Sequence, residues 1–387
     1  MNLQKILIGL CIGLCCYVNV SPAQWDTDSI FDIHTQQGIN AVYNLDFPNA
    51  TREFEALVAL KPKHPAGHFF LAMVEWEKIL IDIDDESRDD TFFDMLDKVI
   101  DLCDERLDEN PNDITALFFK GGAIGFRGRL HAHRSHWLRA ANDGRRALPI
   151  VQKIQELDPN NYDVLLGTGI YDYFAEVVPN EYPFLKPLMI FFPTGNKEKG
   201  IRELRLASEK AKYAAAEASY FLMEVYINYE HQPSNALMPA LKLTARFPNN
   251  PQFARYLGRC YVQTGIWPEV FRVFSDIRKK GLEGMTGYTM NVVREAEYYI
   301  GMYYFTSKVY EMALPHFFAC DSLSRTLDRK NGPSGFMTMT NLRLGQIYDL
   351  QGKRDYALQE YRKVIILNDY ENAHALAEQY TKTPFKY

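Results

Sequence analysis

The sequence predicts an all-α solenoid in which helical hairpins stack on one another, and three observations support this prediction. Apolar residues recur at three- and four-residue steps, as they do on one face of a helix. These segments come in pairs separated by short turns, and the paired pattern recurs along the chain. Hydrophobic residues make up 47% of the chain and aromatic residues 13%, which supplies ample material for a core.

The clearest repeat unit is 338–371. Gly345 in its first predicted helix has no Cβ, so a neighbouring helix can pack close to it, and Gly352 breaks the chain between the two helices. Tyr361 in the second helix then fills the space between pairs. The positions that carry the pattern are Leu342, Leu344, Gly345, Tyr348, Gly352, Ala357, Tyr361 and Val364.

This pattern resembles the tetratricopeptide repeat (TPR), whose units have Leu-Gly-x-x-Tyr in one helix and Ala-x-x-x-Phe in the next. The same order recurs in four regular units, which are 31–64, 217–250, 251–284 and 294–327. Three stretched units are 65–111, 113–159 and 160–213. The resemblance implies a right-handed α-α superhelix of about eight TPR-like helix pairs, closed by a helix near 372–380. A helical-hairpin solenoid with a different pair packing is the alternative.

The N-terminus has the three-part layout of a secretory signal peptide. Lys5 provides a positive charge, Ile6 to Val20 is apolar, and Ser21 to Ala23 supplies small residues for cleavage before Gln24. The apolar run is shorter than the roughly 20 residues that span a bilayer as a helix. We therefore expect residues 1–23 to be removed and 24–387 to form one solenoid. An uncleaved membrane anchor is the alternative.

Composition limits the partners of the mature chain. Loss of Lys5 with the signal peptide changes the formal net charge from -6 to -7, and a mildly acidic chain argues against a nucleic-acid partner. The mature chain keeps Cys103, Cys260 and Cys320, an odd number at wide spacing. We interpret them as small buried hydrophobic residues, although one pair could form a disulfide.

The irregular middle of the chain, 77–199, holds the candidate binding residues. A basic strip at 120–146 is rich in Arg and His, and arginine can bind carboxylate or phosphate through two parallel hydrogen bonds. The predicted binding residues of this strip are Arg127, His131, Arg134 and Arg145. An internally salt-bridged face is the alternative. The histidine spacing differs from the i, i+4 spacing of helical zinc sites, so no metal site is predicted.

A second candidate is the insert at 175–199, where four prolines forbid one continuous helix. The insert is too apolar for a free loop, so it is predicted to be non-helical and to fold back onto the solenoid. It forms either a structural plug or a wall of a binding groove. Its predicted binding residues are Tyr182, Phe184, Phe191 and Phe192.

The acidic segment 81–91 lacks the glycine and the glutamate of a calcium-binding loop, so it is predicted to be a solvated connection whose last acids begin the next helix. No nucleophile, phosphate-loop, zinc-peptidase or Cys-x-x-Cys motif is present, so the sequence predicts neither an enzyme nor a cofactor.

The sequence thus predicts a non-catalytic protein-interaction scaffold of the bacterial cell envelope, as the resemblance to exported TPR proteins implies. It would bind a partner peptide or protein on its concave face. The predicted location is the periplasm or the outer membrane, with peripheral association to that membrane possible. The alternative is a small anionic-ligand binding protein with a pocket between 121–139 and 175–199. The partner and the oligomeric state are not specified by the sequence.

Overall fold

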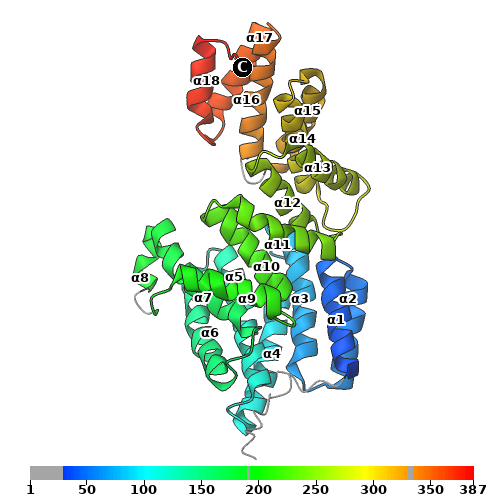
Figure 1. Cartoon of the computed structure of the whole chain (residues 1–387), viewed down its shortest axis with the longest axis vertical. Helices are drawn as coiled ribbons and strands as arrows, with labels where there is room; N and C mark the ends of the chain where they lie inside the picture. The colour runs from blue at the N-terminus through cyan, green and yellow to red at the C-terminus, as the bar shows by residue number, and fades with distance from the viewer. Residues whose placement is uncertain (1–28, 190–191, 330–333) are drawn as a thin grey trace, which may run out of the picture.

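The computed structural model describes residues 29–189, 192–329 and 334–387, and this part of the chain is an all-α solenoid, as predicted (Figure 1). The predicted signal peptide lies outside the described residues. The helices of the first half are α1 (Ser29–Tyr43), α2 (Phe47–Leu60), α3 (Pro65–Ile81), α4 (Asp89–Glu109), α5 (Ile114–His133), α6 (Trp137–Leu157), α7 (Val164–Glu181), the short η1 (Pro183–Leu185), α8 (Lys186–Met189) and α9 (Lys197–Lys210).

The second half begins at α10 (Ala215–Glu224), which continues as the π-helical turn η2 (Val225–Tyr229). The remaining helices are α11 (Pro233–Arg246), α12 (Pro251–Gln263), α13 (Trp267–Leu282), α14 (Met290–Thr306), α15 (Tyr310–Leu327), α16 (Gly335–Leu350), α17 (Arg354–Ile366) and α18 (Ala373–Lys382). The described helices form eight consecutive pairs followed by the terminal helix α18, which agrees with the repeat count from the sequence.

Polar caps and prolines place many of the helix starts. Asp113 accepts a hydrogen bond from the backbone N–H of Ala116 at the start of α5, and Asn250 caps α12 in the same way. Each cap satisfies an N–H group that has no partner within its helix. Pro65 and Pro251 occupy the first positions of α3 and α12, where the missing N–H costs nothing.

A glycine opposite an aromatic ring locks the regular pairs. A Cβ on Gly345 would lie 2.4 Å from the ring of Tyr361, and one on Gly301 would lie 2.8 Å from the ring of Phe317. Gly38 and Gly258 face Phe54 and Phe274 in the same way. The two members of each pair are sixteen residues apart. This is the close approach that the sequence pattern predicts, and each of these rings is fully buried.

The first helices of neighbouring pairs contact one another and form the inner layer. Contacts of this kind join α1 to α3, α3 to α5, α5 to α7, α7 to α10, α14 to α16 and α16 to α18. The inner surface of the solenoid is therefore lined by first helices. Gly258 and Gly301 lie 43 residues apart in the chain, more than the 34 residues of the TPR period, because α13 is followed by a connection over 283–289.

The N-terminal part, α1 to α11, closes on itself. Asn250, at the start of α12, donates a hydrogen bond to the carbonyl oxygen of Tyr43 at the end of α1 (3.0 Å). At the other end of α1, Tyr213 donates to Asp32 (2.6 Å), and Lys212 pairs with the same carboxylate (2.8 Å). Helices far apart in sequence are thus tied side by side, whereas α12 to α18 extend from this body as an arm (Figure 1).

The middle insert is more helical than predicted. Helix α7 continues through Pro179 to Glu181, and η1 and α8 follow directly. Pro179 lies in the last turn of α7, where a missing N–H removes one hydrogen bond without ending the helix at once. Among the described residues of this insert, Tyr182 and 192–196 are non-helical.

The three cysteines are free and buried, which confirms their interpretation as core residues. Burial raises the pKa of the Cys260 thiol to about 12, so this thiol is not poised for reaction. In the described residues, no helix is both long and apolar enough to cross a bilayer.

Candidate functional site

The inner surface of the arm carries two arginines on one face of α12. Arg255 and Arg259 are four residues apart, so both side chains point toward α14. The Nε atom of Arg255 donates to Glu295 of α14 (2.6 Å), and Arg259 donates to the same carboxylate through Nε (2.6 Å) and Nη2 (3.0 Å). Two guanidinium groups therefore share one carboxylate.

The charges of this group do not cancel. Burial would raise the pKa of Glu295, whose side chain is 0% exposed, but the two guanidinium groups outweigh burial and hold its pKa below the ordinary value. Arg255 remains 25% exposed and Arg259 30% exposed. The cluster therefore has one net positive charge, carried by side chains that are partly exposed. A carboxylate of a partner is the group that this geometry suits.

Arg343 extends the positive charge along the inner layer of the arm. It lies on α16, its guanidinium packs on the ring of Phe305 at the end of α14 (5.6 Å), and it donates to Gln346 (2.9 Å). Among the described residues Arg343 forms no ion pair. The first helices α12, α14 and α16 thus present more cationic than anionic charge, which favours an acidic partner segment.

The closed N-terminal part contains a different polar group at its centre. Arg129 of α5 forms an ion pair with Glu217 of α10 (2.7 Å), and its guanidinium packs on the rings of Trp76 (4.9 Å) and Phe221 (4.7 Å). Tyr43 of α1 donates to the same glutamate (3.1 Å). Together these residues join α1, α3, α5 and α10, which belong to four different repeats, so the group stabilises the closure.

A small cavity of about 50 Å³ adjoins this ion pair and is lined by residues that include Tyr43, Glu77, Arg129, Glu217 and Asn250. Burial and the charge of Glu217 raise the pKa of Glu77 to about 8, against the lowering effect of Arg129. The cavity is large enough for water-sized molecules and much smaller than a typical ligand pocket. Its lining carries two carboxyl groups (Glu77 and Glu217) and two guanidinium groups (Arg129 and Arg255), so its small size, rather than its charge, argues against a bound ligand.

The structure places the predicted basic residues in internal contacts rather than in an open groove. Arg127 donates to Asp143 through two nitrogens (3.0 and 2.7 Å) and to Asp97 (2.7 Å). Arg134, whose side chain is 7% exposed, donates to Asp89 through two nitrogens (2.6 and 2.8 Å) and to the carbonyl oxygen of Ile83. The expectation that these guanidinium groups face a ligand is therefore corrected, because nearby carboxylates already occupy them.

The other two residues of the basic strip differ from each other. His131 is 8% exposed, and its ring stacks on Phe93 at 4.7 Å, so it is a packed core residue. Arg145 on α6 is exposed and donates to Asn142 (3.2 Å). Among the described residues, no group of three His, Cys, Asp or Glu side chains is arranged for a metal ion.

The acidic connection between α3 and α4 is solvated, as predicted, with residues 84–88 exposed and its two ends held by contacts. Arg134 holds it through the Ile83 carbonyl and through Asp89, which is 8% exposed. Helix α4 begins at Asp89 rather than near Phe92, and the first turn contains Asp89 and Asp90, where negative charge is favourable.

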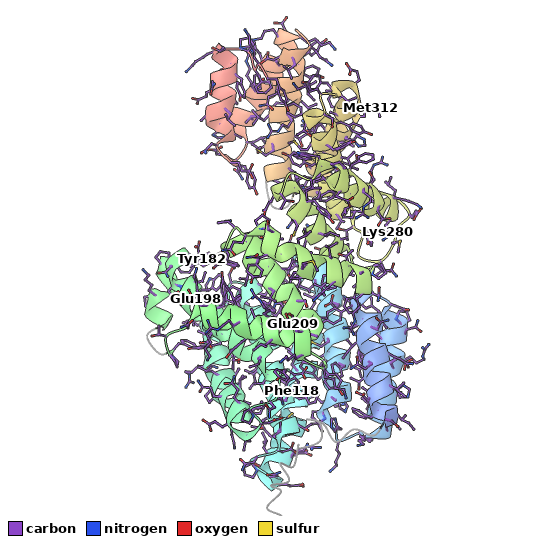
Figure 2. All side chains as sticks on the ribbon, in the orientation of Figure 1. Phe118, Tyr182, Glu198, Glu209, Lys280 and Met312 are labelled. Atoms are coloured by element: carbon purple, nitrogen blue, oxygen red, sulfur yellow. The ribbon has the colours of Figure 1, made fainter. Side chains whose placement is uncertain are left out.

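The predicted aromatic residues of the insert lie at the outer end of α6 and α7. Tyr182 is 45% exposed and Phe184 62% exposed, and the Phe184 ring contacts Trp137 at the start of α6 (centroids 6.2 Å). Figure 2 shows Tyr182 on the same side of the molecule as Glu198, away from Lys280 of the arm. Phe192 is half-buried beside Gly144 of α6, and Phe191 lies outside the described residues. Phe184 and Phe192 thus contact α6 rather than the basic part of α5.

Sequence reasoning missed the inner group of the arm. Arg255 and Arg259 do have a usable signal, since they are four residues apart in the regular unit 251–284. Their partner Glu295 belongs to the next unit, and the sequence does not show which face of α14 meets α12. The sequence does not show that Arg129 is buried, because this residue lies among the other basic residues of the predicted strip.

No family model matches the chain, and no curated protein sequence matches it. Similar solved structures include the human IFIT1 dimer with PPP-AAAA, which is 14% identical over 83% of this chain and 68% of that chain, with a TM-score of 0.40. Yeast Tom70 is 10% identical over 91% of this chain and 88% of that chain, with a TM-score of 0.37. The C-terminal part of a TPR repeat-containing protein from Cytophaga hutchinsonii is 14% identical over 88% of this chain and 98% of that chain, with a TM-score of 0.28. At these values no ligand or partner carries over to this chain.

Proposed function

We propose that this protein is a non-catalytic scaffold of the bacterial cell envelope that binds an acidic segment of a partner protein on the inner surface of its arm. The observation that carries this proposal is the pair of partly exposed arginines, Arg255 and Arg259, held in place by the fully buried Glu295. An arginine fixed in this way loses little conformational entropy when it binds a carboxylate.

The surroundings of this pair suit an extended peptide. Arg259 lies over the ring of Tyr256 (5.7 Å), and the α12, α14 and α16 helices continue the surface in one direction. A solenoid presents such a surface along its whole length, so a partner segment can contact several repeats at once. The alternative of a small anionic ligand is less favoured, because the cavity beside Arg129, at about 50 Å³, is much smaller than a typical ligand pocket.

We further propose that this scaffold is exported to the envelope. The apolar run and small residues of the predicted signal peptide 1–23 support secretion, and a periplasmic or outer-membrane location follows from it. Fractionation of cells that express the full chain and a chain lacking residues 1–23 tests this part. Retention of both chains in the cytoplasm would contradict it.

The binding surface is tested with Arg259→Ala, which leaves Glu295 paired with Arg255. Immobilised protein (24–387) is probed with a library of peptides, each made with acidic residues and with the amide equivalents. We expect the protein to prefer the acidic peptides, and Arg259→Ala to weaken this binding by about tenfold, the effect of one lost charge-assisted hydrogen bond.

Arg272→Ala is the matched control, because Arg272 is 62% exposed on the second helix α13 and pairs with Glu269. It should leave peptide binding unchanged. Equal binding of acidic peptides and amides, or equal losses for the two variants, would rule out the inner arginines as the binding site.

A further inference from the structure

The outer end of α6, α7 and α8 combines exposed aromatic and aliphatic side chains in a way that the inner surface does not explain. Trp137 is 37% exposed, Leu138 73%, Tyr182 45% and Phe184 62%. The ring of Phe184 contacts those of Trp137 (6.2 Å) and Tyr182 (6.3 Å), so three aromatic rings form one cluster. We call these four residues the aromatic tip; α8 beside it is at the left edge of Figure 1.

Exposed cationic side chains lie on the same two helices, α6 and α8. Arg139, Arg145, Arg146 and Lys186 are all exposed. Within the described residues, Arg139, Arg145 and Lys186 form no ion pair, and Arg146 lies 3.9 Å from Asp143, which Arg127 already binds at 2.7 Å. Glu181 adjoins the tip, and the exposed Glu198 lies on the same side of the molecule (Figure 2). A local excess of positive charge is notable in a chain with a formal net charge of -6.

The helical geometry places the two kinds of side chain next to each other. Trp137 and Gly144 are seven residues apart on one side of α6, where the rings of Phe184 and Phe192 cover them. Leu138 and Arg145 form the adjacent row, again seven residues apart, and this row faces solvent. The exposed Leu138 and the arginines are thus presented by one helix.

We propose that the aromatic tip is a membrane-contact site that inserts its rings into the interface of a bilayer containing anionic lipids. Tyr and Trp side chains are favoured at the boundary between headgroups and acyl chains, and neighbouring arginines are attracted to negatively charged lipid. The tip would bind the bilayer peripherally, as an interfacial element with apolar and cationic side chains. An acidic protein surface could pair with the arginines. It would leave the exposed side chains of Leu138 and Phe184 without a comparably apolar partner.

This site is separate from the inner arginines of the arm. The tip is built from α6 to η1, whereas Arg255 and Arg259 lie on α12. The membrane contact therefore does not rest on the peptide-binding function, and either one can fail without the other. Together they would hold a partner segment near a bilayer surface.

Co-sedimentation with vesicles tests the membrane contact. The protein (24–387) is mixed with vesicles of phosphatidylcholine plus phosphatidylglycerol, and with vesicles of phosphatidylcholine alone. We expect binding to the anionic vesicles and at least tenfold weaker binding to the neutral ones. The double variant Leu138→Gln, Phe184→Ser should reduce binding to anionic vesicles by at least tenfold. The double variant Arg145→Ala, Arg146→Ala should reduce this binding by about fivefold for each arginine removed.

The controls separate a local effect from a general one. Ile366→Ser removes an aliphatic side chain that is 83% exposed on α17, and Arg272→Ala removes an arginine that is 62% exposed on α13. Both should bind vesicles like the unmodified protein. Because all the substituted side chains are exposed, we expect each variant to retain its helical circular dichroism, which is measured in parallel.

Three results would overturn the proposal. The protein could remain in the supernatant with anionic vesicles, the tip variants could bind as well as the controls, or a photo-crosslinker at Phe184 could capture an acidic protein while vesicles are ignored. The last result would assign the same surface to a protein partner instead of a lipid.

Discussion

The closed N-terminal part and the C-terminal arm use arginine in opposite ways. In the closed part, Arg134 and Arg127 are enclosed by carboxylates and backbone carbonyls of neighbouring helices. In the arm, Arg255 and Arg259 share one buried carboxylate and remain partly exposed. Arginine therefore has a structural role in one region and forms the proposed binding surface in the other. What differs is the number of acids that the fold brings to each guanidinium.

The largest expected effect tests the structural role of arginine in the closed part. Arg134→Ala leaves Asp89 without its partner and releases the 82–88 connection, so we expect the free energy of unfolding to fall by about 3–5 kcal/mol. Arg145→Ala, on exposed α6, should change it by less than about 0.5 kcal/mol. Urea unfolding of both variants measures the difference. Similar values for the two would mean that the internal ion pairs of Arg134 do not stabilise the closed part.

The second prediction, with a smaller expected effect, concerns the glycine–aromatic contact that recurs in the arm. Gly345→Ala adds a Cβ that would lie 2.4 Å from the Tyr361 ring, so the ring must move, and we expect a loss of about 1–3 kcal/mol. Gly125→Ala in α5 of the closed part has no atom within 4 Å of the new Cβ. It should stabilise the helix by roughly 0.5–1 kcal/mol, the usual gain of alanine over glycine. Thermal unfolding distinguishes the two, and a loss for both would contradict the packing argument.

The third prediction uses two glutamates, the half-buried Glu77 and the buried Glu295, whose pKa values move in opposite directions. The pKa of Glu77 is raised from 4.5 to about 8 in the folded protein, so its contribution to stability is fully present below pH about 4.5 and is lost as pH rises through about 8. The pKa of Glu295 is lowered from 4.5. Its contribution to stability is therefore present at pH values above 4.5 and is lost as the pH falls below 4.5. Raising pH should weaken the closed part, and lowering pH should weaken the arm.

Glu77→Gln isolates the first of these effects, because glutamine stays neutral at every pH. Between pH 5 and 8.5 we expect the unfolding free energy of the unmodified protein to fall relative to that of the variant by about 1–3 kcal/mol, less than the full pKa shift implies since the cavity admits water. Glu283→Gln, at a glutamate that is 54% exposed, controls for the loss of one charge. Parallel pH profiles for the unmodified protein and Glu77→Gln would show that Glu77 is ionised in the folded state.

Most of the fold could be predicted from the sequence because repeat packing is local. Gly345 and Tyr361 belong to one helical pair, and their contact needs only the sixteen-residue spacing and two helices joined by a turn. The same holds for the eight pairs and for the three buried cysteines. The insert was predicted less well, since the prolines suggested a non-helical segment, whereas Pro179 lies in the last turn of α7.

The candidate site could be predicted only in part, because its contacts join different repeats. The sequence marked the aromatic residues Tyr182 and Phe184, whose exposure the structure shows, but not the helix α6 that Phe184 contacts. It also marked Arg127 and Arg134 without their acidic partners, which are 16 and 45 residues away. Charged residues have no periodic signal that pairs them across such distances.

The sequence by itself determined the class of this protein: helical pairs, their order and the residues that fill the space within each pair. The tertiary structure decided which arginines stay partly exposed. A guanidinium is available to a partner only when the fold brings it fewer carboxylates than it can bind, and that balance depends on how one repeat is rotated against the next. The closure of α1 onto the loops before α10 and α12 was decided at the same level, through Asp32 and Asn250.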